Sequence, residues 1–487
     1  MNNKSILLLP FLLIAYYFTH YCLELYYFIE PIRSVKQFLL YVIVTAVLFF
    51  AGRRLSKNEQ RFTLAFITVL FVFLFFGAVI DTFVSVGNMG SLATVGAGSI
   101  LAFLILCTTI IFICYRLSEG LVKKLLTFWA LYFLILLVYD TGIFFLFNKA
   151  EKKYVVSSSE TRKFTNAEKP SVFFLLFDMY PSDIVLKKYL GYDNAAMDTF
   201  LKRKGFYVAG NAHSLYQETY YSLPSTLSLQ SLSYIGDSSL EDYQKKLLAL
   251  KNIQHTVVPA VFENSGYVFR NYSVFDLQGK KSPLQFNLNY HIDNVLTAST
   301  LFNRWYNGFE PDFFLAAHDV DPGFLKTSWS KNIKTDLAYL DESFNHLLDS
   351  FPALRQPSFN YFHFMMPHPP LIYDSSGKEN SIKDMYAYNG FERSNKNFTS
   401  CIGYANRQME RMVNKIFEKA GRNTVIIIQG DHGYREFPGR FPDAVRNGAF
   451  NAVYLPSANY SGFTDSISVL QTFRQVLQTQ FGFPVGK

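Results

Sequence analysis

Long apolar stretches fill roughly the first 150 positions of the chain, and shorter apolar runs separated by polar residues follow. We interpret five of the early stretches as each long enough to cross a bilayer as an α-helix, which takes roughly 20 residues. They lie at about 6–27, 38–50, 62–86, 95–115 and 125–147, and the second is the shortest. The pattern predicts a transmembrane domain of five α-helices over residues 1–147.

Basic residues between these stretches predict the orientation of the chain. They are Arg53, Arg54, Lys57 and Arg61 in one connection and Arg116, Lys123 and Lys124 in another. The connection at 87–94 contains no Lys or Arg, and only Arg33 and Lys36 run against the trend. By the positive-inside rule the amino terminus is cytoplasmic and everything after the fifth stretch lies outside. We therefore expect a multi-pass protein of a bacterial cytoplasmic (inner) membrane, with its larger part periplasmic or extracellular.

The pattern after residue 147 is that of an α/β domain. A polar segment at 148–170 predicts a linker at the membrane surface. Largely apolar runs predict strands buried on both faces at 171–177, 359–366 and 425–428, with shorter strands at 206–209 and 266–269. Helical periodicity lies between them at 184–203, 222–231, 335–351 and 401–420. Alternating strands and helices predict a three-layer α/β sandwich with a mostly parallel sheet over residues 171–487.

Three of the predicted strands are followed by acids or histidines. Asp178 follows the first strand, His368 lies among prolines after the second, and Asp431 and His432 lie between two glycines after the third. The carboxyl ends of parallel strands meet at one edge of a sheet, where open α/β sheets bind ligands. We therefore expect these side chains to lie close together.

The segment QETYYSLPSTLS, residues 217–228, places hydroxyl groups where a loop meets a helix, with Pro224 expected in the first helical turn. The amino terminus of a helix carries free N–H groups and partial positive charge, which bind phosphate oxygens and favour an anionic nucleophile. A divalent cation would convert an unreactive hydroxyl into a nucleophile. The predicted ligands of this cation are Asp178, Thr219, Asp431 and His432. Zinc, which accepts mixed oxygen and nitrogen ligands, is expected ahead of manganese or magnesium.

Some of these residues have alternative interpretations. The Asp431–His432 pair also fits a solvated turn, and Asp183 is the alternative to Asp178. Ser222 is the rival nucleophile to Thr219, and His363 fits an ordinary core histidine. Three acids lie within or at the edge of the apolar stretches, where they either face a cationic lipid head group or simply mark helix ends: Glu24, Asp81 and Asp140.

Composition excludes some classes of protein. Three of the four cysteines fall within the apolar stretches and Cys401 is alone in the outer part, so that part has no disulfide framework. The net charge of +8 is spread thinly, which argues against nucleic acid as a partner and is compatible with anionic lipids. We expect a monomer embedded in the membrane.

The order of these motifs resembles the alkaline phosphatase superfamily. Five amino-terminal spans followed by an outward catalytic domain resemble the membrane-bound phosphoethanolamine transferases and the lipoteichoic acid synthases. The sequence ETYYSLP at 218–224 is similar to the nucleophile segment of the lipid A transferases, in which the threonine becomes phosphorylated. The resemblance implies Thr219 as nucleophile and metal ligand, and His368 as a contact to the substrate or leaving group. It implies metal ligation by Asp178, Asp431 and His432.

The chain departs from that family pattern at several positions. The lipid A enzymes have a Glu where this chain has Asp178, carry disulfides, and have a further histidine downstream, whereas none follows His432 here. This puts a second metal ion in doubt. Sulfatases that use formylglycine need a Cys or Ser, then Pro and Arg at two-residue intervals. Ser222 and Pro224 match, but Thr226 replaces the Arg, so we do not expect a formylglycine sulfatase.

The function that these observations predict is a metal-dependent membrane transferase. It would move a phospho-head group, plausibly phosphoethanolamine, from a phospholipid donor through a phosphothreonine to a glycan or lipid acceptor. The first alternative is a hydrolase on the same scaffold, either a phosphodiesterase or an atypical sulfatase. The second is a membrane scaffold or transport partner without catalytic activity.

Overall fold

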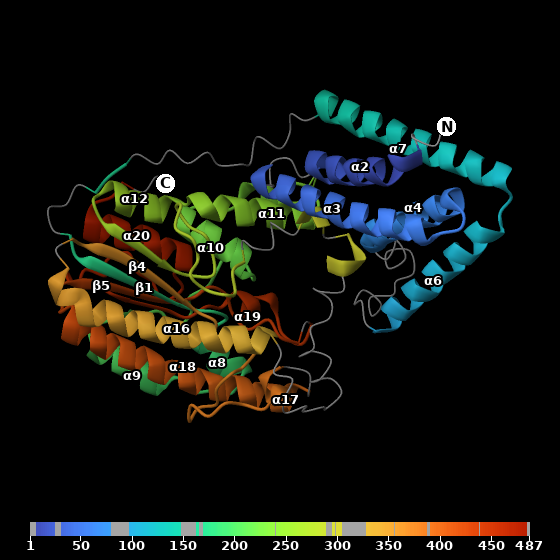
Figure 1. Ribbon diagram of the computed structural model, residues 1–487. Coiled ribbons are helices and arrows are strands. Elements are labelled where there is room, and N and C mark those ends of the chain that lie inside the picture. The colour runs from blue at the N-terminus through green and yellow to red at the C-terminus, as the bar shows by residue number, and fades with distance from the viewer. Residues whose placement is uncertain are drawn as a thin grey trace. The chain divides into compact units, whose positions relative to one another are not determined.

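The computed structural model (Figure 1) describes most of the chain. The described residues are 6–24, 31–78, 97–147, 162–164, 169–238, 240–288, 295–297, 299–303, 328–354, 356–386, 390–437 and 439–484. The chain divides into two compact units, Met1–Lys153 with Tyr290–Glu310, and Tyr154–Asn289 with Pro311–Lys487. The first unit is helical and the second is an α/β domain. The predicted linker at 148–170 lies largely outside the described residues, and the predicted domain limits stay a prediction.

The helical unit contains a helix in each of the five predicted apolar stretches. They are α2 (Leu9–Glu24), α3 (Pro31–Leu55), α4 (Glu59–Leu74), α6 (Ala97–Arg116) and α7 (Glu119–Phe147). Two segments, Ser34–Leu55 and Glu119–Phe145, are long and apolar enough to cross a membrane, whereas Leu9–Leu23 and Leu101–Arg116 are apolar but shorter. Among the described residues, the helical amino-terminal region therefore contains two segments whose length and composition suit a membrane span. The count of five spans stays a prediction.

A short segment from later in the chain packs within this helical unit. The hydroxyl groups of Tyr17 and Ser299 lie 2.9 Å apart, and Ser299 Oγ donates to the carbonyl oxygen of Leu74 at 3.1 Å. Leu301 packs in a small apolar cluster with Phe76. Thus residues 299–303 contribute to the packing of the helical unit, although they are distant in sequence.

Of the three acids in the apolar stretches, Asp140 is the one that the structure places. Its Oδ2 lies 2.8 Å from Nδ1 of His20, so it is paired within the helical unit. Asp81 and the side chain of Glu24 lie outside the described part of the chain. Their predicted role at a lipid head group stays a prediction.

The α/β unit is built on a six-stranded mixed sheet in the order β2-β6-β5-β1-β4-β3. The strands are β1 (Ser171–Phe177), β2 (Tyr207–Val208), β3 (Val268–Tyr272), β4 (Ser358–Phe364), β5 (Thr424–Gly430) and β6 (Asn451–Tyr454). The pairs β1–β4, β1–β5 and β3–β4 are parallel, while β6 is antiparallel to β5 and β2. Every residue of β4 and β5 is buried, as the continuous apolar runs predict.

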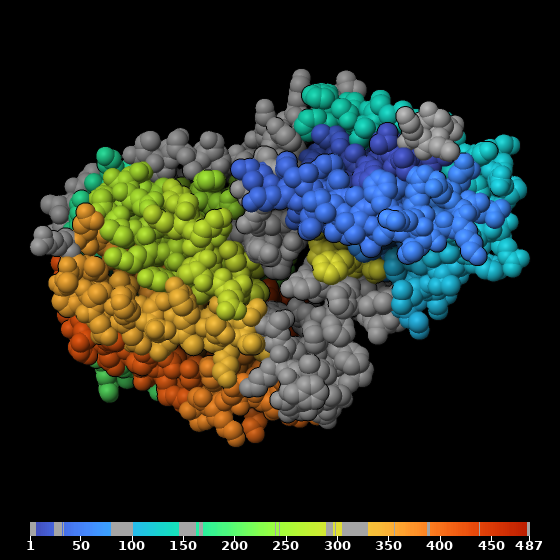
Figure 2. All heavy atoms as spheres, viewed as in Figure 1, coloured from blue at the N-terminus to red at the C-terminus, as the bar shows by residue number. Residues whose placement is uncertain are grey.

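Helices cover both faces of the sheet and give the predicted three layers (Figure 1). One layer contains α10 (Thr219–Ser228), α11 (Asp242–Asn252), α12 (Val257–Asn264) and α20 (Val469–Phe481). The other contains α8 (Asp183–Tyr189), α9 (Ala195–Arg203), α16 (Ser328–Ser350) and α18 (Phe391–Lys419). Two short helices, α17 (Ile382–Met385) and α19 (Asp443–Asn447), lie in loops. In the space-filling view the helices of the two layers cover the strands (Figure 2).

Some predicted elements differ from the observed ones. The helix predicted at 184–203 is two helices, because the chain turns between them through Gly191 with a φ of 68°. Helix α10 begins three residues earlier than predicted, at Thr219, so Pro224 lies inside the helix rather than in its first turn. The prediction also missed β6, α11, α12 and α20, although Ser468 and Gln471 form a capping box that marks the start of α20.

Candidate metal centre and nucleophile

Two adjacent strands bring the predicted acids together. In the parallel β1–β5 pair, Phe177 is aligned with Gly430, so Asp178 and Asp431 leave the sheet side by side. His432 follows directly. Ligand atoms of Asp178, Asp431 and His432 all lie within 4.8 Å of one another, and all three residues are buried. The structure therefore brings these three predicted ligands into one group.

Three atoms of this group have no partner. Within the described part of the chain, Asp178 Oδ1, Asp431 Oδ2 and His432 Nε2 are buried and make no hydrogen bond. The imidazole Nε2 lies 3.8 Å from Asp178 Oδ1 and 3.5 Å from Asp431 Oδ2. An unsatisfied buried polar atom typically costs about 1–3 kcal/mol, so three such atoms facing one another need an explanation. Two carboxylates and an imidazole fit a divalent cation such as zinc.

The remaining atoms of Asp431 and His432 are held by the backbone. Asp431 Oδ1 accepts hydrogen bonds from the N–H groups of Met179 at 2.9 Å and His432 at 3.0 Å. His432 Nδ1 donates to the carbonyl oxygen of Gly433 at 2.9 Å. Since Nδ1 carries the proton, Nε2 presents its lone pair to the centre of the group. Such outer contacts fix the orientation and tautomer of metal ligands.

The second oxygen of Asp178 connects the group to two further side chains. His363 Nε2 lies 3.2 Å from Asp178 Oδ2, and the Thr219 hydroxyl donates to the same oxygen at 3.5 Å. Burial alone would raise the pKa of Asp178, but the nearby imidazoles of His368, His363 and His432 outweigh burial and lower it. Asp178 is therefore an ionised carboxylate, and His363 supports it instead of only filling the core.

Helix α10 positions the candidate nucleophile. Thr219 is its first residue and is buried, with Glu218 in the N-cap position. The rival hydroxyl, that of Ser222, donates to the carbonyl oxygen of Asp431 at 2.6 Å and lies 2.8 Å from Ser214 Oγ. Ser222 thus holds the loop that carries Asp431 in place. Thr219 is the hydroxyl that faces Asp178.

His368 lies beside an arginine that the sequence analysis missed. Arg435 Nη2 donates to His368 Nε2 at 2.9 Å, and His368 Nδ1 lies 2.5 Å from the carbonyl oxygen of Pro369. Burial lowers the pKa of His368, Asp178 opposes that change, and Arg435 and His432 reinforce it. His368 is therefore neutral, with its proton on Nδ1. The only sequence signal for Arg435 was its place in the loop after Gly433.

The alternative acid, Asp183, lies outside the group of three ligands. Its Oδ1 accepts a hydrogen bond from Asn194 Nδ2 at 3.0 Å. Burial and the nearby carboxyl group of Asp198 raise the pKa of Asp183 to about 7. An acid that favours its neutral form in this way is a poor metal ligand, so the geometry favours Asp178.

The glycines on both sides of the Asp431–His432 pair permit close approach of the backbone. A Cβ atom on Gly430 would lie 2.2 Å from the carbonyl oxygen of Tyr180, and one on Gly433 would lie 2.2 Å from that of Val445. Neither site can accept a side chain without movement of the backbone. The two glycines therefore have a packing role in setting the position of the ligands.

Among known proteins, the chain matches the model of one sequence family. The sequence model of the sulfatase family, described as "Sulfatase", matches residues 173–462. No curated protein matches the chain significantly. Solved structures with a similar fold include the lipooligosaccharide phosphoethanolamine transferase A of Neisseria meningitidis, an integral membrane protein. It is 12% identical with a TM-score of 0.41, and the match covers 97% of this chain and 95% of that one.

Two further solved structures match about two thirds of the chain. The periplasmic domain of Escherichia coli EcEptC, in complex with Zn, is 10% identical with a TM-score of 0.39, covering 66% of this chain and 85% of that one. The phosphonate monoester hydrolase of Agrobacterium radiobacter is 13% identical with a TM-score of 0.37, covering 65% and 74%. Similarities this distant do not carry an argument about activity.

Proposed function

The chain belongs to the sulfatase family of the alkaline phosphatase superfamily, and from that premise we propose that it is a metal-dependent transferase of phospho-head groups. The observation that carries the proposal is the group of three unpartnered ligand atoms on Asp178, Asp431 and His432, which lies beside the hydroxyl of Thr219. The donor is a phospholipid with a phosphoethanolamine head group, and the acceptor is a glycan or another lipid. The resemblance of the ETYYSLP segment to the lipid A transferases supports this choice of donor.

A divalent cation, with zinc expected, would be held by Asp178, Asp431 and His432 and completed by Thr219. When bound, it would lower the pKa of the threonine hydroxyl and stabilise negative charge on the phosphoryl oxygens. The protein itself supplies the buried position of Thr219 and the free N–H groups at the start of α10. These features favour an anionic oxygen at the position where phosphorus is attacked.

The reaction divides into two displacements. In the first, Thr219 Oγ1 releases its proton to water and forms a bond to phosphorus, while the bond from phosphorus to the diacylglycerol oxygen breaks. That oxygen leaves with the bonding electron pair and takes up a proton. In the second, a hydroxyl or phosphate oxygen of the acceptor attacks phosphorus, and Thr219 Oγ1 leaves and is reprotonated. The covalent intermediate replaces one difficult displacement with two easier ones.

His368 has a positioning role in this proposal. Its Nε2 accepts from Arg435 and so has no proton to give to the leaving group. The sequence-based expectation that His368 contacts the substrate stays a prediction. We assign His368 to holding the Arg435 guanidinium beside the metal site, where it would contact an oxygen of the phosphoryl group.

The proposed orientation places the α/β unit outside the cytoplasmic membrane, because the positive charges of the helical region gather in the connections expected to be cytoplasmic. Phospholipid head groups of the outer leaflet would then be the available donors. All four proposed ligands belong to this chain, so the expected monomer can form the metal site without a partner chain. Introduced cysteines test this orientation. Cysteines placed at 87–94 and in the α/β unit should react with a reagent that cannot cross the membrane.

Intact mass spectrometry tests the chemistry. The purified zinc-loaded protein is incubated with phosphatidylethanolamine, and the wild type is compared with Thr219→Ala. We expect an adduct of phosphoethanolamine mass on the wild type, none on the variant, and loss of the adduct when an acceptor lipid is added. Steady release of phosphoethanolamine into water without an acceptor would instead establish the hydrolase. A protein that binds no divalent ion would favour the non-catalytic alternative.

A further inference from the structure

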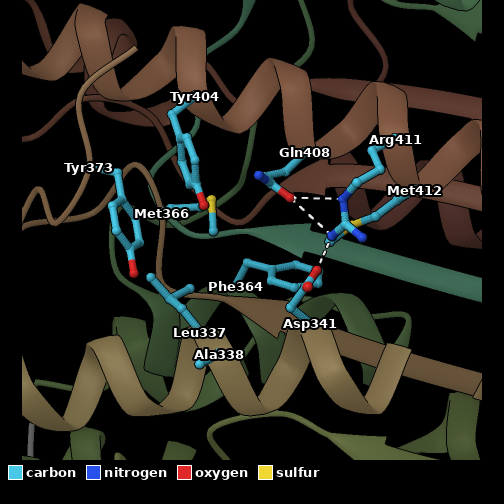
Figure 3. Close-up of a pocket in the computed structure, with 10 residues that line it drawn as sticks. All are labelled: Leu337, Ala338, Asp341, Phe364, Met366, Tyr373, Tyr404, Gln408, Arg411 and Met412. Carbon is cyan, nitrogen blue, oxygen red and sulfur yellow. Dashed lines mark hydrogen bonds and ion pairs between the residues drawn. The ribbon is translucent and has the colours of Figure 1, made fainter. Parts of the chain in front are cut away.

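A pocket of about 300 Å³ lies between α16 and α18 in the α/β unit (Figure 3). The rings of Tyr373 and Tyr404, whose centres are 4.9 Å apart, form one side of it. The other side carries the polar side chains of Asp341, Gln408 and Arg411. All five residues are partly exposed, so a ligand from solvent can reach them. The pocket therefore offers an aromatic side and a polar side to the same ligand.

The charges on the polar side balance each other. Arg411 forms an ion pair with Asp341, and its Nε also donates to Gln408 Oε1 at 3.1 Å. Asp341 and Arg411 are the two charged residues among the described residues that line the pocket. A ligand with a net charge would gain little attraction from this wall, since one charge of the pair would offset the other. The pocket therefore favours a neutral ligand.

Several polar groups in the pocket remain available to that ligand. Within the described part of the chain, the hydroxyls of Tyr373 and Tyr404 and the amide nitrogen of Gln408 make no hydrogen bond. A hydroxyl can both donate and accept, and an amide nitrogen carries two N–H donors. An acyl chain in the pocket would bury these groups without partners, at a cost of about 1–3 kcal/mol for each. A ligand with several hydroxyl groups would satisfy them.

The tyrosine rings are held in place by the loop that follows β4. The N–H of Asp374 donates to the carbonyl oxygen of Lys378 at 2.9 Å, so the loop closes directly after Tyr373. The N–H of Ser375 donates at 2.8 Å to the hydroxyl of Ser400 on α18, the helix that also carries Tyr404. Rings fixed in this way lose little freedom when a ligand binds. Their faces are electron-rich and suit the C–H groups on the flat side of a sugar ring.

The pocket lies at the same end of β4 as the candidate metal centre. Phe364, the last residue of β4, lines the pocket, and its carbonyl oxygen accepts a hydrogen bond from the N–H of Asp178 at 2.9 Å. Met366 also lines it, two residues before His368. A second hollow of about 1210 Å³ shares Ala338 with the pocket and continues along α16. A ligand longer than one ring therefore has room to extend.

We propose that the pocket between α16 and α18 binds a neutral sugar ring of the acceptor. The ring packs its C–H face against Tyr404, and its hydroxyls bond to Gln408 and to the Asp341–Arg411 pair. The group that attacks phosphorus lies on another unit of the same glycan, because the pocket is beside the metal ligands and not over them. This inference rests on the proposed function for the role of the ligand as acceptor. It selects a glycan over a simple lipid.

Saturation-transfer NMR on the full-length, zinc-loaded protein tests the pocket. The protein is held in phosphatidylcholine nanodiscs, which contain neither a sugar nor the proposed donor. The probes are the methyl glycosides of glucose, galactose, mannose and N-acetylglucosamine, and we expect saturable binding of at least one. Tyr404→Ala should weaken that binding about tenfold or more, whereas Tyr404→Phe keeps the ring and should weaken it only about threefold. Gln408→Glu keeps the oxygen that accepts from Arg411 but loses the amide N–H groups, so a loss of about fivefold is expected.

Two matched variants serve as controls. Tyr339→Ala removes an exposed tyrosine from the same helix, α16, and Gln478→Glu changes an exposed glutamine on α20. Both should keep the wild-type affinity, and thermal unfolding with zinc analysis shows that each variant is folded. The proposal would be overturned if no glycoside bound saturably, if Tyr404→Ala and Gln408→Glu both bound like the wild type, or if hexanoate bound in place of the glycosides. Because no donor is present, the result does not depend on whether a threonine adduct forms.

Discussion

Asp178 and Asp183 lie five residues apart after the same strand, yet their surroundings favour opposite charge states. Asp178 is buried among imidazoles that outweigh the effect of burial and lower its pKa. Asp183 lies beside another acid, Asp198, and burial and that neighbour raise its pKa to about 7. The comparison teaches that burial near a strand end does not identify a metal ligand. The kind of neighbour does, since imidazoles surround Asp178 whereas a carboxyl group lies beside Asp183.

The two acids also differ in what their free oxygens face. Asp178 Oδ1 faces the unpartnered atoms of Asp431 and His432, so a cation would satisfy three atoms together. Asp183 Oδ2 is also without a hydrogen bond, but its charged neighbour is a carboxyl group that can share a proton with it. A shared proton is therefore enough to satisfy the free oxygen of Asp183. The three unpartnered atoms around Asp178 instead need a cation that can bind all of them.

The largest expected effect comes from removing one ligand. Asp431→Asn replaces the Oδ2 that faces His432 with a neutral group and should abolish stoichiometric zinc binding, measured by elemental analysis. Turnover should fall roughly a thousandfold or more, as expected when preorganised charge at the reacting centre is lost. Asp183→Asn is the matched control and should bind zinc normally. Full zinc occupancy in Asp431→Asn would refute the assignment of the metal site.

A second large effect concerns the backbone that supports the ligands. In Gly433→Ala, the new Cβ would lie 2.2 Å from the carbonyl oxygen of Val445, so the loop after β5 must move. We expect a loss of about 3 kcal/mol in the free energy of unfolding, together with weaker zinc binding, because the Gly433 carbonyl orients His432. Urea denaturation measures the first quantity. Gly236→Ala, which meets no atom within 4 Å, should be nearly neutral, and equal stability of the two variants would contradict this explanation.

A smaller effect is expected from neutralising Asp183. Below about pH 4 both the folded and the unfolded chain hold its proton, since an unperturbed Asp has a pKa near that value. As the pH rises toward 7 the unfolded chain releases the proton while the folded chain retains it, so this group's contribution to stability falls. Asp183→Asn removes that loss and should stabilise the protein by about 1 kcal/mol or more at pH 8, but little at pH 4.

Thermal unfolding at pH 4, 6 and 8 measures the stability difference between Asp183→Asn and the wild type. The exposed Asp443, whose nearest basic partner Arg446 is 3.8 Å away, provides a control. Asp443→Asn should change stability by less than about 0.5 kcal/mol at every pH. A gain for Asp183→Asn that does not grow with pH would show that its carboxyl group is ionised in the folded protein, and the contrast with Asp178 would fail.

Much of the sheet was predictable because strands that are buried on both faces have mostly apolar sequences. β1 is apolar after Ser171, β5 contains the apolar run 425–428, and β4 is rich in aromatic residues although it also contains Asn360 and His363, so strand type and approximate limits follow from these patterns. Strand β6 was missed because Asn451–Tyr454 is only four residues long and begins with a polar residue. Its antiparallel direction also depends on contacts with β5 that local sequence does not encode. For the same reason the packing of Ser299 within the helical unit was not foreseen.

The candidate site was predictable where a residue's role depends on strand order. Asp178, Asp431 and His432 follow strands whose carboxyl ends lie at one edge, so sequence predicted that they would meet. Arg435 was missed because its contact with His368 Nε2 joins two loops that are distant in sequence, and only the three-dimensional structure shows it. The choice between Asp178 and Asp183 likewise needed the identity of their neighbours.

The smallest expected effect is that of removing the Ser222 hydroxyl. Comparing it with removal of the Thr219 hydroxyl shows which of the two is the nucleophile. Ser222→Ala removes the hydrogen bond to the Asp431 carbonyl and should lower stability by about 1 kcal/mol, with turnover changed only a few-fold. Thr219→Ala should eliminate the covalent adduct while leaving the fold intact. Intact mass and turnover measured on both variants decide the matter. If Ser222→Ala lost the adduct and Thr219→Ala kept it, the nucleophile would be Ser222. The oxygen beside Asp178 would then be a ligand or a structural hydroxyl.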